Sequence, residues 1–154
     1  MLFIFYLTFF HLTFVIILGL VLILDIISYM IYNEMYKVKF YCDSRTGENP
    51  VLDYLYRIDW KSRQKINKYI DFLRDHQGYL DEPYSRQIIW KIRELRVDFS
   101  NKRHRVLYFL MINKTIVLLS IFLKTTNKTP LSEVNLAKSR YYDCINNWKS
   151  YENN

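Results

Sequence analysis

Residues 91–110, KIRELRVDFSNKRHRVLYFL, place a large amount of positive charge among apolar residues that favour β-strands. The segment contains six lysines and arginines and one histidine, namely Lys91, Arg93, Arg96, Lys102, Arg103, Arg105 and His104. A solvated helix face tolerates such charge, whereas strands beside a core hold it only at a cost, because buried charges need partners. Cations that a sheet holds in place are suited to binding phosphate groups and to stabilising charge that develops on them.

Cleavage of a phosphodiester by the neighbouring 2′-hydroxyl would use such cations. Negative charge grows on the phosphorane oxygens during the attack, and guanidinium and ammonium groups stabilise it more than they stabilise the ground state. The reaction also needs a base for the 2′-proton and an acid for the leaving 5′-oxygen. His104 is the obvious titratable candidate, and a lysine whose pKa is lowered by neighbouring cations is the alternative base. Tyr84, Trp90 and Tyr108 could stack on bases, although Tyr108 fits an apolar core better.

Three strand-like runs have to position these groups. They cover residues 88–97, 104–112 and 115–124, and Asn113-Lys114 supplies a hairpin connection between the last two. Lys91 and Arg93 share one face of the first run. Leu95 and Val97 have the same parity, so the apolar face switches, and we expect a bulge near Glu94.

The remaining cations fall where the expected strands begin or end. Arg105 starts the second run, after Lys102 and Arg103 in the loop, while Lys124 and Lys128 lie at and beyond the end of the third. Since several strand ends meet at one edge of a sheet, these side chains could converge on one concave face.

The elements around the three runs complete an α+β pattern. Residues 36–42 alternate as a strand, Asn49 and Asp59 can cap two successive helices, and a last helix runs from Thr129 to about Trp148. The order of strand, two helices, three antiparallel strands and helix predicts a small antiparallel or mixed sheet of about four strands covered by helices. An apolar helical segment precedes it.

That segment, residues 1–34, differs sharply in composition from residues 35–154, so the sequence predicts two parts. Residues 2–32 contain one acid, Asp25, one histidine, His11, and no lysine or arginine. About 20 consecutive apolar residues span a bilayer as a helix, so the segment is long enough to be transmembrane.

Two interpretations of the apolar segment stay open. As a transmembrane helix it would leave the basic domain in the cytoplasm, because Lys37 and Lys39 follow it. Alternatively, it is an upstream extension absent from the working protein, since translation could start at Met30 or Met35. A secretory signal peptide fits poorly, because no positive charge precedes the apolar run.

The remainder of the chain is strongly basic. All 22 lysines and arginines lie from Lys37 onward, where 13 acids leave a net charge of +9. A domain this basic favours a polyanionic partner, either nucleic acid or an anionic membrane surface. The two cysteines lack CxxC spacing, and the three histidines and three glycines are scattered. We therefore expect no metal or nucleotide cofactor.

Four segments in this order resemble the RelE/HigB superfamily, and more narrowly the phage-derived HigB-like toxins of type II toxin–antitoxin systems. They are WKIRELR (90–96), RHRVLYF (103–109), FLKTTNKTP (122–130) and SEVNLAKSR (132–140). The helix opening NPVLDYL also matches, so the resemblance covers about residues 36–142.

The resemblance implies a small RNase-like α+β fold that cleaves mRNA without a metal, usually in the ribosomal A site. By motif, Arg96 of ELR and Arg105 of RVLY match the groups that contact the phosphate in the transition state. Lys91 and Arg93 match basic strand residues that bind substrate or act as base. His104 has no secure counterpart in the family.

The resemblance also bears on RNA binding and on partners. Lys124 and Lys128 match the basic segment before the last helix, and Lys102 and Arg103 look like loop contacts to the RNA backbone. The implied partners are mRNA, the ribosome and a helix-turn-helix antitoxin, with membrane contact through residues 2–32 if these are translated. The apolar segment has no counterpart in the family pattern.

Three functions are consistent with these observations. The first is an mRNA endonuclease toxin neutralised by an antitoxin. The second is a toxin on the same fold that poisons a DNA topoisomerase without cutting RNA. The third is a membrane-anchored cationic protein that binds nucleic acid. Cations on sheet strands favour the first, because a catalytic face needs them held in place.

Overall fold

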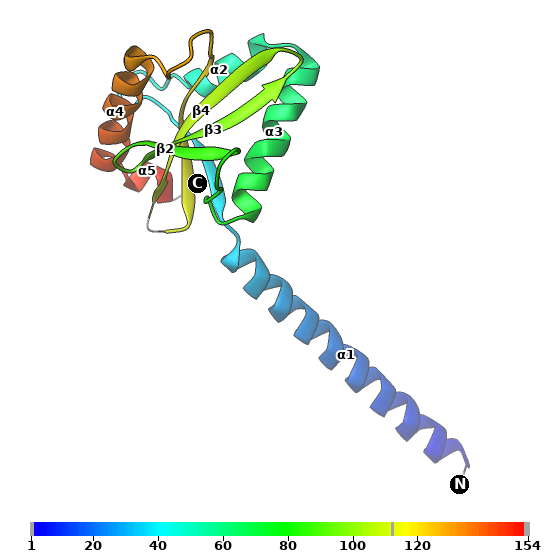
Figure 1. Ribbon diagram of the computed structural model, residues 1–154. Helices are drawn as coiled ribbons and strands as arrows, with labels where there is room; N and C mark the ends of the chain where they lie inside the picture. Colours follow the sequence, from blue (N-terminus) through cyan, green and yellow to red (C-terminus); the bar gives the residue numbers. More distant parts are fainter. Residues whose placement is uncertain (1, 112, 153–154) are drawn as a thin grey trace. The chain divides into compact units, whose positions relative to one another are not determined.

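The computed structural model describes residues 2–111 and 113–152, with the side chains of residues 13–30, 35–111, 113–149 and 151. The chain divides into two units, Met1–Met35 and Tyr36–Asn154. The first unit consists of one helix, α1 (Leu2–Glu34) (Figure 1). Its window Thr13–Met30 is long and apolar enough to cross a membrane, by length and composition alone.

The second unit is built on a five-stranded mixed sheet. The strands are β1 (Lys37–Phe40), β2 (Ser85–Ile89), β3 (Ile92–Phe99), β4 (Lys102–Met111) and β5 (Thr115–Leu123). Their order is β1-β5-β4-β3-β2. β1 runs parallel to β5, and every other pair is antiparallel. The predicted α+β class is confirmed, with five strands where about four were expected.

Helices cover both faces of this sheet (Figure 1). They are α2 (Pro50–Arg57), α3 (Trp60–Asp75), α4 (Leu131–Asn146) and the short α5 (Lys149–Glu152). α2 and α3 pack on one side, which we call the α2/α3 face, and α4 packs on the other, the α4 face. Each face buries its own apolar cluster, so the sheet lies between two cores.

Local sequence signals explain where α2 and α3 begin and end. The side chain of Asn49 accepts a hydrogen bond from the amide of Leu52, and that of Asp59 accepts one from the amide of Ser62. At the far end of α3, Gly78 adopts a φ of +76°, and its amide donates to the carbonyl of Leu73.

Strand periodicity decides which core each side chain joins, because successive residues point to opposite faces. Leu95 and Val97 of β3 belong to the core under α2 and α3. Ile92 of β3, with Leu107 and Phe109 of β4, belongs to the core under α4. Both faces of β3 and β4 therefore carry core residues. Each charged residue on these strands shares either the α2/α3 face or the α4 face with one of the two cores.

The expected single strand 88–97 is wrong. Trp90 and Lys91 form a turn that joins β2 to β3, and Ile89 pairs with Ile92 across it. The turn reverses the chain because Trp90 adopts a φ of +51°. The register shift lies between Gln87 and Ile89 instead of near Glu94. The apparent switch of the apolar face has a simpler cause, because β3 is buried on both of its faces.

The other expected elements differ only at their ends. β4 ends at Met111, and residue 112, expected to be its last, lies outside the described residues. Asn113 and Lys114 lie in the turn before β5. The last helix starts at Leu131, just after the expected Thr129-Pro130.

Candidate active site

Arg96 and Arg105 are direct neighbours across the β3–β4 pair. Arg96 has the parity of Ile92 and Arg105 that of Leu107, so both lie on the α4 face. Two like charges directly opposite each other in a sheet repel. The predicted pair therefore needs a compensating charge close by.

Glu94 provides that charge, and its side chain is 0% exposed. Its Oε1 lies 3.2 Å from Nε of Arg86, 3.4 Å from Nε of Arg96 and 3.9 Å from Nε of Arg105. Thr129 donates a hydrogen bond to Oε2 and accepts one from Arg86 at 3.1 Å. We call Glu94 and its three arginines the arginine cluster. The cluster draws on β2, β3 and β4, and Thr129 contacts it from the segment before α4.

Two exposed carboxylates bind the outer side of the cluster. Glu82 pairs with Nη1 of Arg96, and Asp98 pairs with Nη1 of Arg105. The side chains of Glu82 and Asp98 are 61% and 64% exposed. Their arginine partners are less exposed, at 23% for Arg96 and 6% for Arg105, so only the carboxylate of each pair faces water.

Lys124 follows β5 and joins the same neighbourhood. Its side chain is buried, and its backbone amide donates to the carbonyl of Arg103 at 2.8 Å. Burial lowers the pKa of the Lys124 amine below its usual value; Glu94 opposes this shift, and the guanidinium groups of Arg86 and Arg105 add to it. Lys124 was predicted to bind RNA, and the main cause of its lowered pKa is burial, with the neighbouring cations second.

Arg93 lies on the other side of the sheet. Its guanidinium donates to the carbonyl of Leu80 at 2.9 Å and to the hydroxyls of Ser85 and Tyr108 at 3.3 Å. It also lies 4.4 Å from the centre of the Tyr79 ring. The structure thus does not bring Arg93 to the cluster, and its donors are used within the α2/α3 face.

His104 is also on the α2/α3 face, since it alternates with Arg105 along β4. Its Nδ1 lies 2.9 Å from the hydroxyl of Tyr54, and its buried Nε2 has no hydrogen-bond partner among the described residues. Burial lowers the pKa of the imidazole, and the positive charge of Lys102 lowers it further. The sheet itself separates His104 from the arginine cluster.

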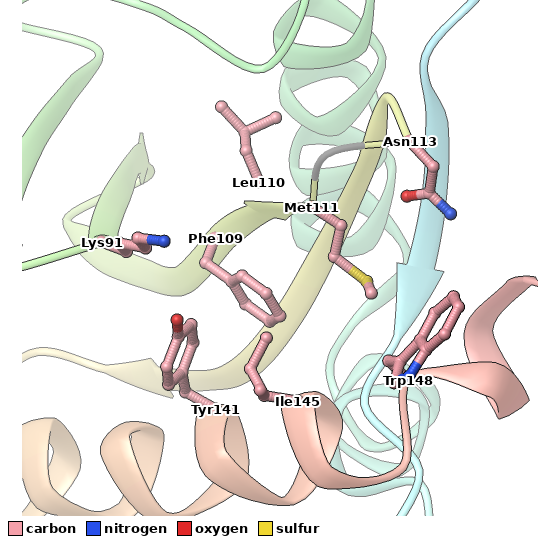
Figure 2. A pocket seen from close by; sticks show the side chains of 8 residues that line it. All are labelled: Lys91, Phe109, Leu110, Met111, Asn113, Tyr141, Ile145 and Trp148. Atoms are coloured by element: carbon pink, nitrogen blue, oxygen red, sulfur yellow. The ribbon is translucent and has the colours of Figure 1, made fainter.

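Lys91 lies at a hollow of about 460 Å³ between α4 and the β4–β5 hairpin (Figure 2). The other residues that line the hollow are Phe109, Leu110, Met111, Asn113, Tyr141, Ile145 and Trp148. Because Lys91 is in the turn before β3, it does not join the cluster on the strand.

The predicted RNA-binding residues are spread over several places. Lys102 pairs with Asp59 at 2.7 Å, at the start of α3. Arg103 is half-buried and lies opposite Asp98 in the β3–β4 register. Lys128 is exposed in the segment before α4. Lys124 and Arg103 lie beside the cluster, since Arg103 shares the α4 face with Arg105 and its carbonyl accepts from the Lys124 amide.

Sequence reasoning assigned no role to Glu94, Arg86 or Thr129. A signal existed for Glu94, because it has the parity of Arg96 within β3 and is the one acid among closely spaced arginines. Of the three expected stacking aromatics, Tyr108 is fully buried, as expected for a core residue, while Tyr84 and Trp90 are exposed.

Replacing Glu94 by glutamine should destabilise the protein, because three guanidinium groups would lose the buried carboxylate that compensates them. We expect a loss of about 2–3 kcal/mol in the free energy of unfolding, since two of the arginines can still be hydrated. Chemical denaturation of the full chain in detergent measures it, with the exposed Glu48→Gln as control. Equal stability of Glu94→Gln and wild type would show that the carboxylate does not hold the cluster.

His104 should make stability depend on pH. Its pKa is lower in the folded protein than the usual value of about 6.5 in the unfolded chain. The neutral ring thus contributes stability above that value, and this is lost as the pH falls through the folded pKa. We expect the melting temperature to fall between about pH 7 and pH 5, and less steeply in His104→Gln. An unchanged slope in His104→Gln would contradict the assignment.

Comparison with known proteins places this geometry in a family. No group of three or more metal-binding side chains is present in the part of the chain that the structure describes. No curated protein gives a significant match to the chain. The family described as "Phage derived protein Gp49-like (DUF891)" matches residues 53–142, from α2 to α4, which include the whole arginine cluster and Lys124. The chain therefore belongs to the phage-derived Gp49-like family, which lies within the RelE/HigB-type toxin superfamily.

Proposed function

We propose that this chain is a HigB-like toxin of a type II toxin–antitoxin system that cleaves mRNA without a metal ion, in association with the ribosome. The observation that carries the proposal is the arginine cluster, with Lys124 beside it on the α4 face. Guanidinium groups held against a buried carboxylate are already oriented before substrate arrives, which is the condition for electrostatic stabilisation of a transition state.

The proposed reaction is an attack of the ribose 2′-oxygen on the adjacent phosphorus. The bond from phosphorus to the 5′-oxygen breaks, leaving a 2′,3′-cyclic phosphate and a 5′-hydroxyl. Arg96 and Arg105 exchange Glu82 and Asp98 for the non-bridging phosphate oxygens, where charge accumulates. Lys124 in its neutral form takes the 2′-proton, as the lowered pKa of its amine favours. A water molecule protonates the leaving 5′-oxygen, and the hydroxide that this leaves takes the proton back from Lys124.

The other predicted residues receive different roles in this proposal. Arg93 and His104 stay outside the reaction, because their bonds lie on the α2/α3 face. Lys102, Arg103 and Lys128 contact the RNA backbone, and so does Lys91 from its turn. Contacts of this kind raise affinity without choosing a sequence.

The proposed partners follow from charge and from the family. A toxin–antitoxin context calls for a cognate antitoxin, which we propose to be a helix-turn-helix protein encoded by a neighbouring reading frame. A domain with a net charge of +9 attracts an acidic partner at long range. Such an antitoxin would compete with RNA for the same cations.

We further propose that α1, where it is translated, anchors the domain at the cytoplasmic face of a membrane. Its window Thr13–Met30 is apolar enough to span the bilayer, and Lys37 and Lys39 follow on the cytoplasmic side. Release of the full chain from membranes by alkaline carbonate would contradict the anchor. Activity of a chain started at Met35 would show whether the domain needs it.

Expression of the chain from Met1 or from Met35 should arrest growth of a bacterial host, with mRNA cut at defined positions. Arg96→Ala combined with Arg105→Ala should relieve the arrest and slow cleavage at least about 100-fold, because the transition-state charge would lose two contacts. Primer extension on cellular mRNA locates the cuts. Intact mRNA together with failing DNA supercoiling would favour topoisomerase poisoning instead.

Single replacements separate charge from proton transfer. Lys124→Arg keeps the positive charge but cannot act as a base, so cleavage should be lost while RNA binding stays. Arg105→Lys keeps a charge but not the fork of donors and should lose only part of the rate. If Lys124→Arg cleaves as fast as wild type, the base is another group.

Glu82→Gln should tighten RNA binding, because Arg96 would no longer have to exchange a carboxylate for phosphate. We expect a gain of about two- to fivefold in affinity, the size of an exposed ion pair. Fluorescence anisotropy with an uncleavable RNA measures it, with the neighbouring exposed Asp81→Asn as a matched control for lost charge. An equal gain in both variants would mean that net charge alone is responsible.

A further inference from the structure

We propose that the junction of α2 and α3 is a second RNA contact, in which Tyr56 and Trp60 stack on unpaired nucleobases. The proposal rests on the proposed function in that it takes RNA as the ligand. It lies on the α2/α3 face, apart from the arginine cluster, and uses none of its residues.

The first observation is a cation between two exposed aromatic rings. Tyr56, near the end of α2, is 71% exposed, and Trp60, the first residue of α3, is 64% exposed. The guanidinium carbon of Arg63 lies 5.9 Å from the Tyr56 ring centre and 5.8 Å from the Trp60 ring centre. Nε of Arg63 is buried without a hydrogen-bond partner among the described residues. Two large aromatic rings are thus exposed to solvent, with the guanidinium of Arg63 close to both.

The second observation is the charge around these rings. Arg57 follows Tyr56 and Lys61 follows Trp60 in the chain, and both are exposed. Asp59, the acid between them, is already engaged, because its carboxylate accepts hydrogen bonds from Ser62 and from Lys102. The junction therefore presents aromatic faces for bases and cations for phosphates, the combination used by proteins that bind single-stranded nucleic acid.

The third observation is a series of cations that links the junction to the cluster. Lys102, paired with Asp59, starts β4, and Arg103 follows it. Because Arg103 and Arg105 share the parity of the α4 face, the β3–β4 hairpin presents cations on both of its faces. A strand of RNA bound at Arg105 can pass around this hairpin and reach Trp60.

The composition of the junction favours RNA over a protein partner. Tyr, Trp and Arg also anchor protein interfaces, but there they are surrounded by contacts that exclude water. In residues 50–65 the exposed large apolar side chains are Tyr56 and Trp60, with no aliphatic one beside them. The hollow lined by Met111 and Ile145 is different, since aliphatic and aromatic groups mix there.

The test is RNA binding by the full chain in detergent micelles, measured by fluorescence anisotropy. The probe is a labelled single-stranded RNA of about 12 nucleotides with 2′-O-methyl groups, which the proposed reaction cannot cut. A second probe has the same phosphates with abasic sugars. We expect Trp60→Ala and Tyr56→Ala each to weaken binding of the first probe about tenfold and to leave binding of the abasic probe unchanged.

Trp60→Phe should recover most of the affinity, because a ring for stacking remains. Trp148→Ala removes an exposed aromatic residue from the α4 side and should bind both probes like wild type. Thermal unfolding of each variant checks that it is folded. A base-dependent loss in Trp60→Ala supports the inference even if wild type leaves unmodified RNA intact, in which case the nuclease proposal alone fails.

Normal RNA binding by both alanine variants would overturn the inference, even if the wild-type chain cuts RNA. An equal loss with both probes would overturn it as well, since the rings would then not be stacking on bases. So would a wild-type chain that binds neither probe. If Trp60→Ala instead abolishes binding of the cognate antitoxin and leaves RNA binding normal, the junction is a protein interface.

Discussion

The burial of one carboxylate, that of Glu94, determines how the rest of the candidate site is built. An ionised group removed from water is stable only when opposite charges lie close by. Arg86, Arg96 and Arg105 supply these charges from three neighbouring strands, and Thr129 adds a hydrogen bond from the segment before α4. Charge pairing, in addition to apolar packing, therefore contributes to the alignment of β2, β3 and β4 and to the approach of α4.

The same arrangement leaves positive charge directed outward. Three guanidinium groups share one inner carboxylate, so the cluster keeps donors for a further anion, and in the free protein Glu82 and Asp98 bind there. Both carboxylates are largely exposed and remain hydrated when unpaired, whereas the carboxylate of Glu94 is fully buried. The buried acid thus orients the arginines, and the two exposed acids occupy the positions where the proposed function places a phosphate.

Much of this could be predicted from residue patterns, and the failures have physical causes. Residue patterns located every helix except the short α5, and all but one of the strands. The missed turn contains Trp90 and Lys91 with no glycine, proline or asparagine, and its positive φ at Trp90 has no signal in the residue types. Because that turn was taken for a strand, Lys91 and Arg93 were placed on one face. Arg93 is adjacent to Glu94 in β3, and His104 is adjacent to Arg105 in β4. Adjacent strand residues point to opposite faces, so Arg93 and His104 lie on the face away from the cluster.

Glu94 was overlooked for a different reason, since an acid among cations looks like ordinary charge balance until its burial is known. That distinction matters for selectivity. A net charge of +9 attracts any polyanion, RNA and anionic lipid alike, and salt screens the attraction over about 8–10 Å. Selection of RNA has to come from groups that act at contact distance. In the proposed function, oriented guanidinium groups would recognise the phosphate and rings would recognise the base, which a lipid head group lacks. Discrimination between RNA and lipid requires cations and rings in defined positions. The buried carboxylate of Glu94 fixes the positions of the arginines.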